Sequence, residues 1–161
     1  MQALAILFGV VAAAAVCGLI VMVAQRRRQV AHARASALHQ VIVGAHQLAD
    51  AAMAIPNNNE PIAVTLWWRL VEAHDATLNA ARSALTQLRA HDRLAPAFTD
   101  VSTAQEALRA AVATDRSVRV DAPAPTNEQL DYSAALVRER ANALRESADA
   151  LEALILPTAV H

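Results

Sequence analysis

One uninterrupted apolar segment near the start of the sequence limits what this chain can fold into more than any other feature. It runs from Ala3 to Ala24 and contains 22 residues without a charged or strongly polar side chain. As a helix it would span about 33 Å at ~1.5 Å per residue, enough to cross a hydrocarbon core of about 30 Å. The segment therefore predicts a transmembrane helix that anchors the rest of the chain.

Three arginines, Arg26, Arg27 and Arg28, directly follow the apolar segment, and no Lys or Arg precedes it. The positive-inside rule then places the N-terminus outside and the C-terminal part in the cytoplasm. A secretory signal would carry its positive charge before the apolar run. A lipoprotein site would need a small residue before Cys17, where the sequence has Val16. We therefore expect a retained single-pass anchor in the cell membrane, in contact with the lipid bilayer.

Small residues recur at every fourth position of the apolar segment, at Ala5, Gly9, Ala13 and Cys17. A helix face of small side chains allows another transmembrane helix to approach closely. An alanine-rich segment also produces this spacing by chance, so both interpretations stay open. If the spacing is functional, other membrane protein subunits are predicted to bind this face of the helix.

The composition excludes several classes of function for the remainder of the chain. No glycine follows Gly44 and the chain has no lysine, which excludes a glycine-rich phosphate loop and lysine-based covalent chemistry. The net charge of −1 argues against nucleic-acid binding. The single cysteine lies in the apolar segment, so no disulfide can form within the chain. Aromatic residues make up only 3%, so a core must be built from Ala, Leu and Val, which suit helices.

Amphipathic segments with three-to-four spacing predict helices along the whole chain. Three helices are expected over about Ala3–Ala54, Pro61–Leu94 and Phe98–Val118. A fourth helix is predicted from Thr126 and Gln129, which have the spacing of a capping box, and it should end at Pro157. The expected inward stripe of the second helix is Leu66, Leu70, Val71, His74, Leu78, Ala81, Leu85 and Leu88.

Short proline-containing connections between these helices indicate an antiparallel bundle. We therefore expect an all-α chain in which the transmembrane helix continues into a cytoplasmic antiparallel bundle of about four helices. The expected parts are an anchor with its basic flank over residues 1–28, the bundle over 29–157, and a tail over 158–161.

Three histidines, His32, His39 and His46, recur every seven residues on the first helix. Seven residues rise about 10.5 Å along a helix, too far for two of them to bind one metal ion. A solvated helix edge is the favoured interpretation, and a pH-sensing role is a minor alternative.

Glu72, His74 and Asp75 form a polar cluster on the second helix. A metal site would need ligands from another helix, and no such spaced set is recognisable in the sequence. These residues are therefore interpreted as ordinary surface pairs. No catalytic, cofactor-binding or metal-binding residue is predicted, and the chain is not expected to be an enzyme.

The two tryptophans, Trp67 and Trp68, are adjacent and would point about 100° apart on a helix. Core packing is favoured for at least one of them. An exposed tryptophan away from the membrane would instead suit contact with a soluble partner, so both residues are candidates for such a contact.

The lysine-free, Ala- and Arg-rich character, together with the anchor, Arg26–Arg28 and a small helical domain, resembles one class of protein. These are the single-pass accessory subunits of the actinobacterial respiratory supercomplex, which joins a cytochrome bcc complex to a cytochrome oxidase. The resemblance implies a non-catalytic role in assembly or stabilisation. The alternative is a membrane-tethered cytoplasmic adaptor or signalling module that binds a soluble protein.

Overall fold

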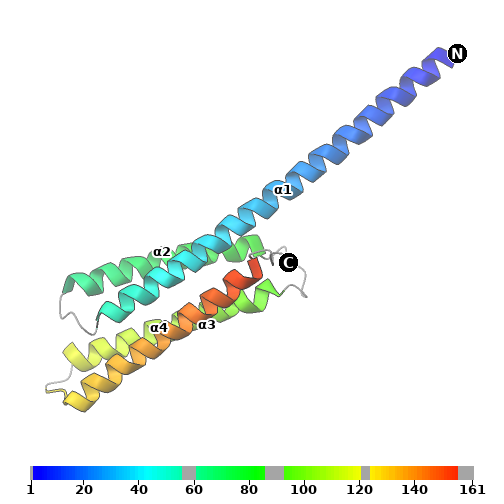
Figure 1. Cartoon of the computed structure of the whole chain (residues 1–161). Helices are drawn as coiled ribbons and strands as arrows, with labels where there is room; N and C mark the ends of the chain where they lie inside the picture. The colour runs from blue at the N-terminus through cyan, green and yellow to red at the C-terminus, as the bar shows by residue number, and fades with distance from the viewer. Residues whose placement is uncertain (1, 56–60, 86–92, 121–123, 156–161) are drawn as a thin grey trace. The chain divides into compact units, whose positions relative to one another are not determined.

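The computed structural model describes residues 2–55, 61–85, 93–120 and 124–155, with side chains described from Val21 onward except at 61–63 and 84. Every extended regular element in these ranges is an α-helix, which confirms the predicted all-α class (Figure 1). The helices are α1 (Gln2–Ala54), α2 (Pro61–Leu85), α3 (Leu94–Val120) and α4 (Asn127–Ile155).

The structure divides into two units, over residues 1–36 and 37–161. The second unit begins at Ala37, and the division into an anchor over 1–28 and a bundle over 29–157 stays a prediction. Arg26, Arg27 and Arg28 are exposed in the first unit. The side chains of residues 1–20, which make up most of the predicted membrane segment, lie outside the described residues, as does the predicted tail at 158–161.

Among the described residues, no helix is both long and apolar enough to cross a membrane.

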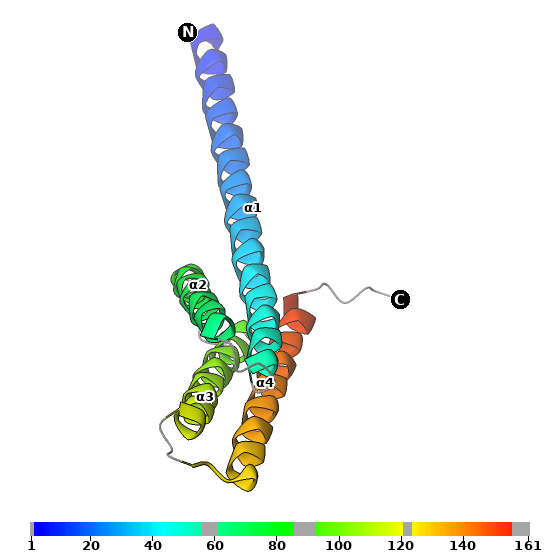
Figure 2. The same ribbon diagram turned by 90° about the vertical axis from the view of Figure 1, so that its left-hand side faces the viewer.

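The second unit is built from residues 37–54 of α1 together with α2, α3 and α4. The helices α3 and α4 lie side by side in both views (Figures 1 and 2). They run antiparallel, since Asp115 near the end of α3 meets Ser133 near the start of α4. On α1 and α4, His46 faces Asp149 whereas the later Asp50 faces the earlier Arg145, so this pair is antiparallel too.

The start of α4 follows the predicted capping box. The Thr126 backbone N–H donates to Gln129 Oε1 at 2.9 Å, and the Gln129 N–H donates to Thr126 Oγ1 at 3.2 Å. The start of α3 differs from the prediction, because the helix begins at Leu94 rather than Phe98. Pro96 then lies in the first turn, where its missing N–H costs no helical hydrogen bond.

The core of the second unit consists of alanine and aliphatic side chains, with Trp67 the largest fully buried one. Alanines at positions such as 45, 49, 141 and 148 are buried, which allows neighbouring helix backbones to approach closely. The predicted inward position of Leu66 is wrong, since 55% of this residue is exposed. Trp67, one position along, is fully buried in its place. The rest of the predicted stripe is confirmed at Val71, His74, Leu78, Ala81 and Leu85, which are buried, while Leu70 is half-buried and Leu88 lies outside the described residues.

Candidate functional site

A buried histidine joins three helices of the second unit. His74 on α2 is 2% exposed, and each of its ring nitrogens lies against an oxygen of a different helix. Nε2 is 2.9 Å from the backbone carbonyl oxygen of Val41 on α1, and Nδ1 is 2.7 Å from Gln105 Oε1 on α3. Both oxygens are hydrogen-bond acceptors, so a doubly protonated ring would donate to both of them.

The orientation of the Gln105 amide is fixed from its other end. Gln105 Nε2 donates to Asp75 Oδ1 at 2.6 Å, which leaves Oε1 directed at His74. The second Asp75 oxygen accepts from Arg109 at 2.7 Å, and Arg109 also pairs with Glu106. The chain of hydrogen bonds therefore runs from buried His74 to a partly exposed Asp75–Arg109 ion pair.

Gly44 on α1 makes room for this histidine. A Cβ atom at position 44 would lie 2.5 Å from His74 Cδ2, well inside van der Waals contact. A glycine inside a helix costs about 1 kcal/mol relative to alanine. The close approach of the imidazole gives that cost a structural reason, because any side chain here would displace the ring.

A second buried polar group links α3 to α4. Asp115 is fully buried, accepts from Ser133 Oγ at 2.6 Å, and pairs with Arg119 Nε at 2.7 Å. The Arg119 side chain is only 21% exposed, so the charge of the carboxylate is balanced close to the core. Buried carboxylates need such a partner, since an isolated buried charge is strongly destabilising.

The buried polar groups in these two networks have a structural role, because they join neighbouring helices. The side chains of His74, Gln105, Asp115 and Ser133 are the buried polar ones among the described residues, and each is hydrogen-bonded to a neighbouring helix. A catalytic base or nucleophile instead needs a side chain that faces substrate. Their arrangement supports a role in fixing how the helices pack.

An apolar groove lies beside the histidine network on the surface between α1 and α2. It has a volume of about 420 Å³, and His39, Val43 and Gln47 of α1 line it opposite Leu70 and Thr77 of α2. His74 and Gly44 also line it. Since the ring nitrogens of His74 are already hydrogen-bonded, the groove offers mainly apolar contacts.

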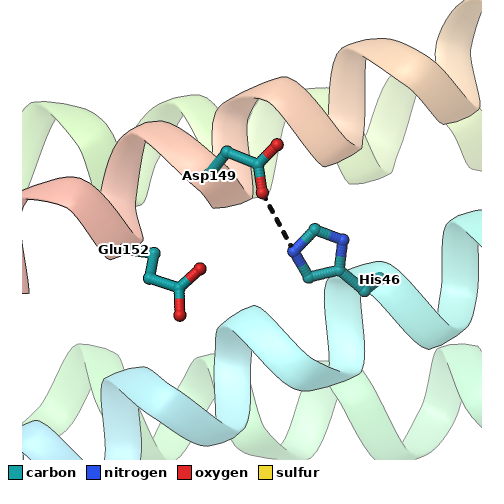
Figure 3. Close-up of side chains that lie close together, drawn as sticks. All are labelled: His46, Asp149 and Glu152. Atoms are coloured by element: carbon teal, nitrogen blue, oxygen red, sulfur yellow. Dashed lines mark ion pairs between the residues drawn. The ribbon is translucent and has the colours of Figure 1, made fainter.

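A third cluster lies nearer the surface, between α1 and α4. His46 of α1 and Asp149 of α4 point toward each other, and Glu152 lies one turn further along α4 (Figure 3). His46 Nε2 is 3.2 Å from Asp149 Oδ1, and one donor atom from each of the three side chains lies within 4.8 Å of the others. The His46 and Asp149 side chains are 36% and 64% exposed, so solvent reaches the cluster.

An arginine of α4 close to this cluster in sequence is already paired with another carboxylate. Arg145, one turn before Asp149 on α4, forms an ion pair with Asp50, one turn after His46 on α1. Arg145 also contacts the Met53 sulfur at 3.8 Å. Within the described residues, Asp149 pairs only with His46, and Glu152 makes no ion pair.

The residues singled out from the sequence fall at different places in the structure. The small residues Ala5, Gly9, Ala13 and Cys17 lie outside the residues whose side chains are described. His32 and His39 are exposed, and His39 lines the groove rather than joining His46. The interpretation of His74 as part of a surface pair is wrong, because the ring is buried between helices.

The two tryptophans have different environments. Trp67 is fully buried, so the prediction that it contacts a soluble partner is wrong, and the favoured core role is confirmed for this residue. Trp68 is half-buried and packs against the ring of Trp67 in an edge-to-face arrangement, with ring centres 4.8 Å apart and planes at 74°. Aromatic pairs favour this geometry. A partner contact through Trp68 stays a prediction.

Sequence reasoning missed Gln105 and Asp115, although both fall on the apolar stripe of α3 at spacings of three and four from buried Val101, Leu108 and Val112. A polar residue on such a stripe is a signal for a buried hydrogen bond. It also missed the cluster of His46, Asp149 and Glu152. No sequence spacing connects residues 103 positions apart, so only the packing of α1 on α4 brings them together.

Comparisons with protein-family models, with curated proteins and with solved structures found no match. The protein is therefore classified by its fold alone. It is an all-α chain with four described helices and polar networks between them.

Proposed function

We propose that this chain is a non-catalytic, membrane-anchored subunit that assembles with other membrane proteins. The observation that carries the proposal is the 22-residue apolar segment Ala3–Ala24 followed by Arg26–Arg28. Its length matches the hydrocarbon core of a bilayer, and its arginines favour a cytoplasmic location for the helical unit. The use of buried polar groups to join helices adds support for a structural role.

The small-residue face of the anchor defines where a membrane partner would bind. By the helical period, Ala5, Gly9, Ala13 and Cys17 share one side of the segment. Lipid tails are as apolar as the helix, so helices associate in membranes mainly through close packing. A partner helix would gain van der Waals contact along this face, which bulkier residues would block.

The proposal is tested by purifying the tagged full chain in mild detergent from its native membrane and identifying the proteins that accompany it. The double variant Gly9→Ile, Ala13→Ile should lose these companions. A matched variant, Val11→Ile with Ala15→Ile, adds bulk on the opposite side of the helix and should keep them. Subunits of a cytochrome bcc complex and oxidase are the first companions to look for, given the architectural resemblance.

Other results would overturn the proposal. Recovery of the chain without companions, or equal recovery from both double variants, would contradict assembly through this face. Retention of one soluble protein by the bundle after removal of the anchor's partners would favour the adaptor alternative. The exposed apolar residues Val43 and Leu66 would then be the first positions to substitute.

The orientation is tested separately with single-cysteine chains in intact cells. Cys17→Ala removes the only natural cysteine, and Asp131→Cys then introduces one at an exposed position of α4. A membrane-impermeant thiol reagent should label this cysteine only after the cells are opened. Labelling in intact cells would place the helical unit outside.

A further inference from the structure

We propose that His46, Asp149 and Glu152 form a binding site for a divalent transition-metal ion, best matched by Zn²⁺, which links α1 to α4. The inference goes beyond the proposed assembly role and does not depend on it. It stands on the convergence of one imidazole and two carboxylates from two helices (Figure 3).

The distances suit a shared ion. Zinc bonds of about 2.0–2.1 Å in tetrahedral geometry place two ligand atoms roughly 3.3 Å apart. His46 Nε2 and Asp149 Oδ1 are already 3.2 Å apart. Glu152 has its donor atom within 4.8 Å of the other two. Glu152 follows Asp149 by three residues on the same helix face, so a change of its side-chain rotamer would bring its carboxylate toward the shared ion.

The charges also favour a cation. Asp149 and Glu152 bring two negative charges to one imidazole, and the adjacent Arg145 is held by Asp50. Within the described residues, no arginine or lysine forms an ion pair with either carboxylate. A divalent ion would balance the two carboxylates while the neutral imidazole completes the ligand set.

The donor types select among metals. Calcium and magnesium prefer ligand sets built from oxygen alone, whereas imidazole nitrogen suits zinc and the neighbouring transition metals. Three protein ligands on an accessible surface leave a fourth position for water. The ion would tie residues 103 positions apart in the sequence, and binding only the folded arrangement would raise the stability of the bundle.

The test uses the full chain in mild detergent, purified through a tag without histidines and freed of metal with a chelator. Titration with ZnCl₂ by calorimetry should show one ion per chain, and the thermal unfolding midpoint should rise with zinc concentration. Magnesium at the same concentration should leave the midpoint unchanged. Far-UV circular dichroism of each metal-free variant confirms that it is folded.

Three substitutions at the site and two matched controls decide the outcome. Asp149→Asn and Glu152→Gln preserve side-chain size and should each weaken zinc binding by about tenfold or more, while His46→Ala should abolish it. The controls are His39→Ala, seven residues earlier on α1, and Glu146→Gln, an exposed carboxylate of α4. Both should bind zinc as the unsubstituted chain does. Absence of zinc binding by the unsubstituted chain, or binding that survives all three site substitutions, would overturn the proposal.

Discussion

Replacing Gly44 by alanine should destabilise the bundle, although alanine is the better helix former. In an unstrained helix the change would stabilise by about 1 kcal/mol. Here the new Cβ would lie 2.5 Å from His74 Cδ2. The ring cannot move aside freely, because its nitrogens are held by Val41 and Gln105.

The expected size of the effect follows from these two opposed contributions. Displacing the ring would weaken two buried hydrogen bonds, each worth about 1 kcal/mol and more where a partner is left unsatisfied. A loss of about 2–3 kcal/mol thus exceeds the gain in helix propensity. The net destabilisation should be about 1–2 kcal/mol, which lowers the unfolding midpoint by roughly 3–8 °C for a domain of this size.

The decisive control is the same substitution in a chain that carries His74→Ala. Without the imidazole the clash is gone, so Gly44→Ala should now stabilise by about 0.5–1 kcal/mol. Thermal unfolding of the four chains, followed by circular dichroism at 222 nm (the usual helix wavelength), completes the double-mutant cycle. If Gly44→Ala stabilises in both backgrounds, the reasoning about close approach is refuted.

Three further predictions are checked by the same unfolding measurement. Asp115→Ala should cost about 3 kcal/mol, since it leaves Arg119 without its buried partner; a loss below about 1 kcal/mol would contradict that pairing. Thr126→Ala should cost about 1 kcal/mol because it removes the cap of α4, whereas Thr126→Ser should cost little, and equal costs would count against the cap. Leu66→Ser should change stability by less than about 0.5 kcal/mol because the side chain is exposed, while Leu78→Ala in the core should cost about 2–4 kcal/mol; a cost at Leu66 as large as that at Leu78 would restore the inward position expected for Leu66 from the sequence.

The helices and the α4 cap could be predicted because their signals are local. Thr126 and Gln129 are three residues apart, and the hydrogen bonds between them need no tertiary contact. The face of α2 was harder to place, because Leu66 and Trp67 are adjacent and both apolar. Only packing decides which of them is covered, and the larger surface of the tryptophan gives its burial the greater hydrophobic gain.

The polar contacts between helices could not be predicted, because each depends on how two distant segments meet. His74 lies at an apolar position of its helix, but its partners are a backbone carbonyl of α1 and a glutamine of α3. The cluster of His46, Asp149 and Glu152 is even harder to predict, since both carboxylates come from the far end of the chain. Sequence spacing along one helix describes neither arrangement.

The polar groups of the second unit fall into two kinds: buried groups that join helices, and accessible groups that are able to bind a ligand. His74 and Asp115 are buried and meet complementary partners on other helices, so removing either partner leaves a dehydrated polar atom. His46, Asp149 and Glu152 are accessible, and no arginine of the described residues pairs with either carboxylate. Buried and satisfied groups hold helices in register, whereas an accessible donor set can still gain energy from a ligand. The α1–α4 edge is therefore where an ion from solution would change the stability of this bundle.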